Sequence, residues 1–112
     1  MYRVVKRDDK IVDFDISKIK GAMLLAFEAQ NKPCHPDILD LLALKVTADF
    51  APKVKDDLIA VEDIQDSVEA VLIQAGYADV AKAYILYRRQ REKLRNVKST
   101  MLDYRDTVDK YL

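Results

Sequence analysis

The residues of this chain that are best equipped to bind a ligand are cations in two separate stretches. Lys6, Arg7 and Lys18 lie near the N-terminus, and Arg88 and Arg91 belong to a basic run much further along. Each of these side chains carries a positive charge and N–H donors, which are the groups that hold a phosphate or a carboxylate in a protein site. The two stretches therefore indicate a site for a polyanion, provided that the fold brings them together.

Catalysis is not indicated by the residue types. The chain has one histidine, one cysteine and two glycines, so it holds neither a histidine-activated nucleophile nor a glycine-rich phosphate loop. Cys34 and His35 stand side by side between two prolines, and we expect them to be ordinary loop residues. The sequence thus predicts a binding domain with no catalytic residue and no metal site built from side chains.

The composition is that of one small domain without a strong charge preference. The 112 residues include 19 bases and 19 acids, which gives a net charge of zero, so bulk electrostatics favour neither nucleic acid nor an anionic membrane. No apolar run approaches the length of a membrane span, and no secretory leader opens the chain. We expect a cytoplasmic protein without a nucleic-acid or membrane partner.

The N-terminal residues predict a β-hairpin followed at once by a helix. Residues 2–6 and 11–14 are rich in β-branched and apolar side chains, and they flank two aspartates at 8–9. Such a pair suits a turn, because Asp tolerates positive φ better than most residues. Asp15 can accept backbone N–H bonds as the N-cap of a helix over residues 16–30.

Three further helices and one strand are predicted downstream. The helices are expected over residues 36–50, 62–75 and 78–96, and the strand over residues 58–61. In the helix 36–50 the side chains expected to face the core are Ile38, Leu41, Leu42 and Val46. The predicted class is α+β, with a bundle of about four helices capped by a small hairpin or three-stranded sheet.

Lys18 and Lys20 lie in the first turns of the first predicted helix. The helix dipole is positive there and the first backbone N–H groups are unpaired, so a cation costs about 0.3–1 kcal/mol unless an anion compensates it. A bound phosphate would do so, and the basic residues of the hairpin would reach it. The alternative is that Asp13 and Asp15 offset the charge while both lysines are solvated.

The basic run in the last helix also has two interpretations. Four of its side chains recur at three- and four-residue spacing and so share one stripe of the helix: Tyr84, Arg88, Arg91 and Arg95. That stripe would point its arginines at one polyanion, whereas Arg89 and Lys93 would face elsewhere as surface residues. The alternative is a solvated basic face, because cations near a helix C-terminus are favoured by the dipole alone.

The opening of the chain resembles that of the ATP-cone, a small nucleotide-sensing domain of ribonucleotide reductases and of one family of transcriptional repressors. The matching positions are Val4, Lys6, Arg7, Asp8, Phe14, Asp15, Lys18 and Ile19. Segments 64–69 and 84–88 are similar to the third and fourth helices of that family. Asp9 stands where the family usually has glycine, and Val61 and Val12 stand where a hydroxyl and a carboxylate are common. Ligand contacts from Val61 and Val12 are therefore not carried over.

The resemblance implies a site for ATP or dATP, with Mg²⁺ accompanying the phosphates. The residues that it implies as nucleotide-binding are Lys6, Arg7, Phe14, Asp15, Lys18, Ile19, Gln65, Tyr87, Arg88 and Arg91. It further implies that ATP activates and dATP inhibits a reductase. Gln65, Lys18 and Asp15 are the candidates for telling one ribose from the other.

The domain organisation follows from the same resemblance. Residues 1–96 correspond to the ATP-cone, and residues 97–112 are similar to the join between cone and catalytic barrel in anaerobic, glycyl-radical ribonucleoside-triphosphate reductases. The implied partners are that catalytic domain and further copies of the parent reductase. Two alternatives stay open: a repressor-type regulator that binds DNA through the helix at 88–95, and a helical interaction module without a ligand.

Overall fold

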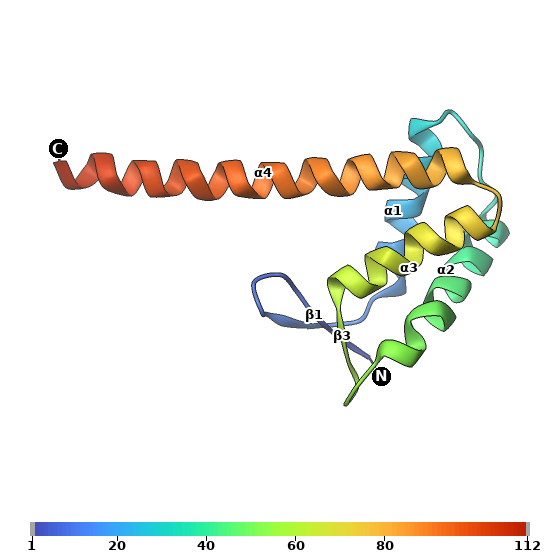
Figure 1. Ribbon diagram of the computed structural model, residues 1–112. Helices are drawn as coiled ribbons and strands as arrows, with labels where there is room; N and C mark the ends of the chain where they lie inside the picture. The colour runs from blue at the N-terminus through green and yellow to red at the C-terminus, as the bar shows by residue number, and fades with distance from the viewer. Residues whose placement is uncertain (1, 112) are drawn as a thin grey trace.

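The computed structural model describes residues 2–111, and the side chains of residues 2–94 (Figure 1). In chain order the elements are β1 (Arg3–Val5), β2 (Ile11–Asp13), α1 (Ile16–Ala29), α2 (Pro36–Phe50), a 3₁₀ turn (Ala51–Lys53), β3 (Leu58–Ala60), α3 (Val61–Gln74) and α4 (Ala78–Tyr111). Over these residues the predicted α+β class, four helices with a three-stranded sheet, is confirmed. None of the helices in the described part of the chain is both long enough and apolar enough to cross a bilayer.

β1 is the central strand of the sheet, which has the order β2-β1-β3. β2 pairs with it antiparallel, with Val4 opposite Val12, and β3 pairs with it parallel. In the hairpin turn the backbone N–H of Lys6 donates to the carbonyl of Lys10 at 2.8 Å, and Asp9 has a φ of 65°. Asp enters this left-handed region at less cost than most residues. The predicted hairpin therefore forms without the glycine.

Helix α1 starts directly after the hairpin because Asp15 caps it. The carboxylate of Asp15 accepts a hydrogen bond from the backbone N–H of Ser17 at 3.0 Å and another from the Ser17 hydroxyl at 2.6 Å. These bonds to Ser17 lower the pKa of the Asp15 carboxyl. The predicted N-cap is thereby confirmed, and it fixes where the first turn of α1, with Lys18, leaves the sheet.

Helix α2 has the predicted bounds, but the predicted inner face is partly wrong. Ile38 and Leu41 are 41% and 52% exposed. The buried side chains of α2 are Leu42, Ala43, Val46 and Phe50. The inner stripe is therefore rotated toward Ala43 and Phe50, and the Phe50 ring packs edge-on against those of Tyr2 and Phe14. His35, given no role from the sequence, caps α2: its Nδ1 accepts from the backbone N–H of Asp37 at 3.1 Å.

Helices α3 and α4 are joined by a tight turn at Gly76, whose φ of 89° ends α3. Helix α4 is longer than predicted, since it continues to Tyr111 rather than ending near residue 96. No proline or glycine follows Gly76 in the sequence, so nothing in its residue types breaks the helix. In Figure 1 the C-terminal half of α4 extends away from the other elements. The assignment of residues 97–112 as a linker stays a prediction.

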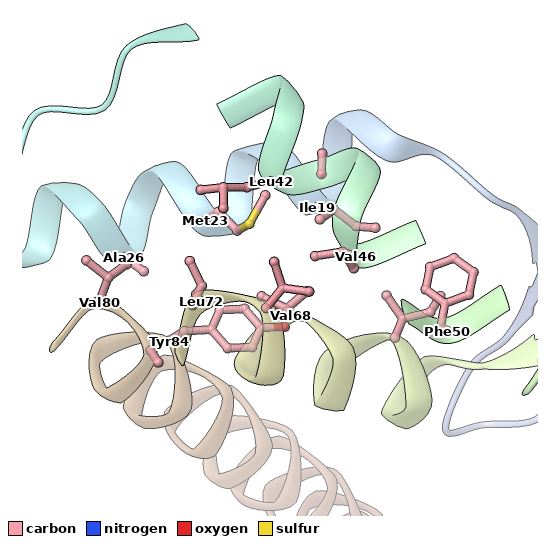
Figure 2. Packing of buried hydrophobic residues seen from close by; sticks show 14 of the residues in the cluster. Ile19, Met23, Ala26, Leu42, Val46, Phe50, Val68, Leu72, Val80 and Tyr84 are labelled. Carbon is pink, nitrogen blue, oxygen red and sulfur yellow. The ribbon is translucent and has the colours of Figure 1, made fainter. Parts of the chain in front are cut away.

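One hydrophobic core holds the four helices and the sheet together. Figure 2 shows side chains from α1, α2, α3 and the start of α4 pointing into a common interior. The largest fully buried apolar side chains are Phe27, Phe50, Met23, Leu72, Val46, Val68 and Val80. Val4 and Ile59 of the two paired strands belong to the same cluster. This shared core fixes the hairpin, α1, α3 and α4 relative to one another, which positions the side chains described below.

Candidate functional site

A cleft of about 380 Å³ lies where the hairpin, α1, α3 and α4 meet. The residues that line it are Arg7, Lys18, Ala22, Gln65, Tyr84, Tyr87, Arg88 and Arg91. Six of these belong to the set expected from the sequence, and they come from segments far apart in the chain. Of these six, the hairpin contributes Arg7, α1 contributes Lys18, α3 contributes Gln65, and α4 contributes Tyr87, Arg88 and Arg91. The fold therefore brings the two basic stretches to one place.

Arg7 is the most connected side chain of the cleft. Its Nε lies 3.2 Å from the Glu62 carboxylate on α3, and its Nη1 lies 3.3 Å from the Glu92 carboxylate on α4. Its Nη2 donates to the side-chain oxygen of Gln65 at 3.3 Å. Arg7 thus joins the hairpin turn to both helices, and the sequence alone did not indicate its partners.

Arg88 is already neutralised by acids of α3. One of its nitrogens, Nη1, donates to both Asp66 and Glu69 at 2.9 Å. The side chain is only 19% exposed. Burial lowers the pKa of the guanidinium, but the two hydrogen-bonded carboxylates outweigh this effect and leave the pKa raised. Arg88 is therefore a fixed cation that joins α4 to α3.

Arg91 and Lys18 are the cations of the cleft whose charges are not used by an acid. Neither forms an ion pair with any side chain in residues 2–94. Arg91 instead donates to the phenol oxygen of Tyr87 at 2.9 Å. Lys20, which was considered together with Lys18, pairs with Asp40 of α2 at 2.9 Å. Of the two α1 lysines, only Lys18 faces the cleft.

Lys6 lies beside the main cleft rather than in it. It lines a hollow of about 220 Å³ together with Arg7, Asp8 and Arg91. Because Arg7 and Arg91 line both spaces, the hollow continues the cleft toward the hairpin turn. A ligand longer than the cleft would reach Lys6 in this direction.

Three residues from the expected set line neither the cleft nor the adjoining hollow. Phe14 packs edge-on against Phe50, with ring centroids 5.6 Å apart, and against Tyr2 at 6.2 Å. Ile19 is 7% exposed and belongs to the core. Asp15 caps α1, with its carboxylate bound to Ser17. In this structure these three residues hold the hairpin and α1 in place, and their contact with a ligand stays a prediction.

Two lining residues were absent from the expected set. Tyr84 is 6% exposed, and burial raises its pKa to about 12, so its phenol is protonated at neutral pH. Ala22 follows Lys18 by one helical turn and leaves room beside it. The available signal was helical spacing, since Tyr84 lies four residues before Arg88 and Ala22 four residues after Lys18.

The described residues hold no group of three or more His, Cys, Asp or Glu side chains that could bind a metal ion. The lining of the cleft itself contains no carboxylate. Its chemistry is that of cations, an amide and two phenols, which suits an anionic, partly aromatic ligand.

The sequence pattern of the ATP cone domain matches residues 2–93 of this chain. The chain belongs to the ATP-cone family. This agrees with the resemblance of the opening hairpin, and the match covers the sheet, the first three helices and the part of α4 that lines the cleft.

Several relatives of this ATP-cone are ribonucleotide reductases. It is 42% identical over 107 residues to the vitamin B12-dependent ribonucleoside-diphosphate reductase of Mycobacterium tuberculosis, covering 95% of this chain and 14% of that protein. It is 36% identical over 98 residues to the ribonucleoside-diphosphate reductase subunit alpha of Chlamydia pneumoniae, covering 82% and 9%. It is 30% identical over 104 residues to the anaerobic ribonucleoside-triphosphate reductase of Haemophilus influenzae, covering 89% and 14%. The chain thus spans a small part of each relative.

Proposed function

We propose that this ATP-cone binds ATP and dATP in the cleft and thereby regulates a ribonucleotide reductase, with ATP as activator and dATP as inhibitor. The observation that carries the proposal is that Arg7, Lys18 and Arg91, from three separate elements, line one cleft. The family match and the reductase relatives support the same ligand class.

We propose that the phosphates lie at the Lys18 side of the cleft. Lys18 belongs to the first turn of α1, where the positive end of the helix dipole favours an anion. A phosphate there compensates the cation that α1 carries without an acidic partner. A triphosphate would extend from Lys18 to Arg91, and through the adjoining hollow to Lys6.

We propose that the adenine and ribose lie against the Gln65 amide and the phenols of Tyr84 and Tyr87. Gln65 can both donate and accept hydrogen bonds, so it can read a ribose hydroxyl that ATP has and dATP lacks. Tyr84 and Tyr87 supply aromatic surface. No carboxylate lines the cleft, and Asp8 is the one carboxylate that lines the adjoining hollow. We therefore propose that Mg²⁺ is held mainly by phosphate oxygens and water.

The parent is proposed to be a cytoplasmic ribonucleotide reductase in which this domain is regulatory and carries no catalytic residue. The anaerobic class expected from residues 97–112 is represented among the relatives at 30% identity, while B12-dependent reductases share 42%. A glycyl-radical motif in the catalytic part of the parent would establish the anaerobic class, and its absence would favour the B12-dependent one.

Calorimetry with the 112-residue chain tests ligand binding. A micromolar Kd for ATP, corresponding to about −8 kcal/mol, is expected. Regulation is tested on the parent: light scattering with each nucleotide should show a change in assembly between ATP and dATP, since a ligand shifts an equilibrium only by its difference in affinity for the two states. Failure of ATP and dATP to bind at millimolar concentration would overturn the proposal.

A further inference from the structure

The contacts of Arg7 differ from those of Arg88 in a way that bears on ligand binding. All three contacts of Arg7 are between 3.2 and 3.3 Å, and its Nε makes no well-aligned hydrogen bond although Glu62 lies beside it. Arg88 holds its two acids at 2.9 Å. Charge-assisted bonds to carboxylates are strongest at about 2.7–2.9 Å. Arg7 is thus held loosely by two carboxylates, whereas Arg88 is held firmly.

The two acids on Arg7 can be released at low cost. The Glu62 and Glu92 side chains are 44% and 55% exposed, so water can replace the guanidinium around both carboxylates. Glu92 also has Arg89 at the preceding helical turn, at a spacing that allows pairing on one helix. Arg7 itself is 24% exposed and lines the cleft, so a ligand phosphate can reach it.

We propose that Glu62 and Glu92 act as built-in competitors of the nucleotide. In the ligand-free protein they occupy Arg7 and fasten the hairpin turn to α3 and α4, and the phosphates displace them when the nucleotide binds. This inference rests on the proposed function for the identity of the ligand. If this is correct, removing either carboxylate strengthens nucleotide binding, although neither glutamate is proposed to contact the nucleotide.

The test compares three variants that each remove one negative charge. Glu62→Gln and Glu92→Gln should each bind ATP about two- to fivefold more tightly than the unaltered chain, the fold-change that corresponds to an exposed ion pair. Asp63→Asn is the matched control, because it removes a charge from the first turn of α3 without contacting Arg7. Its affinity should change less than either glutamine variant. Equal gains in all three would indicate a general charge effect and overturn the proposal.

Two further outcomes would also contradict it. Weaker ATP binding in Glu92→Gln would mean that the carboxylates position Arg7 for the ligand instead of competing with it. Unchanged binding in both glutamine variants would mean that Arg7 stays on its acids when ATP is bound. In either case ATP still binds, so the proposed function stands while the competition fails.

Hydrogen exchange supplies a measurement that needs no ligand. The turn amides of Lys6 and Asp9, which donate within the hairpin, should exchange faster in Glu92→Gln than in the unaltered chain. Faster exchange in a protein that does not bind ATP would support the attachment of the hairpin by Glu92 and would overturn the proposed function. Equal exchange would show that Glu92 does not fasten the hairpin, which overturns the inference.

Discussion

Arg91 donates to the phenol oxygen of Tyr87 at 2.9 Å, and its guanidinium carbon lies 5.7 Å from the centre of the same ring. The arginine is therefore aligned along α4 by a residue one turn earlier, without an acid taking its charge. Tyr87 lines the cleft on one side of α4 and a second space of about 320 Å³ against α1 on the other. Arg91 therefore has a defined orientation and forms no ion pair within residues 2–94, so its charge is available to a ligand. The charge of Arg88, in contrast, is already paired with two acids.

The phosphate-binding role is tested first at Lys18 and Lys6. Lys18→Ala or Lys6→Ala should each weaken ATP binding by about 1–3 kcal/mol, because each removes one charge-assisted hydrogen bond to a phosphate. Arg89→Ala is the control, since Arg89 is exposed on α4 and does not line the cleft. Titration calorimetry measures all three. A loss at Arg89 as large as at Lys18 would point to general attraction by the basic helix.

Discrimination between ATP and dATP is tested at Gln65. Gln65→Ala should narrow the difference in affinity between the two nucleotides more than it weakens either one, because the amide is proposed to contact the ribose hydroxyl. Calorimetry with both nucleotides on the variant gives the two affinities. An unaltered ratio together with a large common loss would assign Gln65 to holding Arg7 instead, with which it shares a hydrogen bond.

The cap at Asp15 makes stability depend on pH. Its pKa is lowered from the ordinary 3.8 by the bonds from Ser17. A carboxyl with a lowered folded pKa contributes fully above its unfolded pKa, and the contribution is lost as the pH falls through the folded value. The excess stability of the unaltered chain over Asp15→Asn, which keeps a neutral cap, should therefore shrink below pH 3.8 in urea unfolding. A difference that stays constant down to lower pH would contradict this.

Ser67 is a buried hydroxyl whose removal should not harm the protein. It is 1% exposed, and its Oγ has no hydrogen-bond partner among the described residues. An unpaired buried polar group costs about 1–3 kcal/mol, so Ser67→Ala should leave stability unchanged or raise it by up to about 1 kcal/mol. Ser17→Ala, which removes a hydroxyl that is bonded to Asp15, should lower the melting temperature in the same assay. Clear destabilisation by Ser67→Ala would contradict this.

Duplex DNA offers the test of the repressor-type alternative. A groove-reading helix needs free basic side chains and binds with a steep dependence on salt. Arg88 is bonded to Asp66 and Glu69, and Arg91 lines the cleft, so we expect no submicromolar binding in a gel shift at physiological salt. Tight, salt-dependent DNA binding that does not change when ATP is added would favour the hypothesis of a repressor-type regulator.

The elements that local signals define were predictable from the sequence. Local signals determine where these elements begin and end: the turn residues at 8–9, the cap at Asp15 and the glycine at the end of α3. The hairpin and the starts of the helices therefore lie near their predicted positions. The inner face of α2 was wrong at Ile38 and Leu41, because several stripes of that helix are apolar and only packing against its neighbours chooses between them.

The candidate site was predictable in its cations and not in their partners. Lys18, Arg88 and Arg91 could be selected by spacing and by resemblance. Which of them is neutralised depends on acids brought in by other helices, as Glu69 is for Arg88. Such tertiary pairings leave no periodic signature in the sequence, so Glu62 and Glu92 could not be connected with the hairpin before the fold was known.

Because α4 is continuous, a movement at the cleft would be transmitted along the whole helix. The 34 residues of this helix correspond to a rod of about 50 Å, and about 30 Å of it lies beyond Arg91. A helix without an internal proline or glycine has no hinge to absorb a tilt. A tilt of about 10° at the cleft would therefore move the far end by about 5 Å, given the helical rise per residue. A small change in the tilt of α4 on phosphate binding would therefore produce a larger displacement at the C-terminal end of the helix.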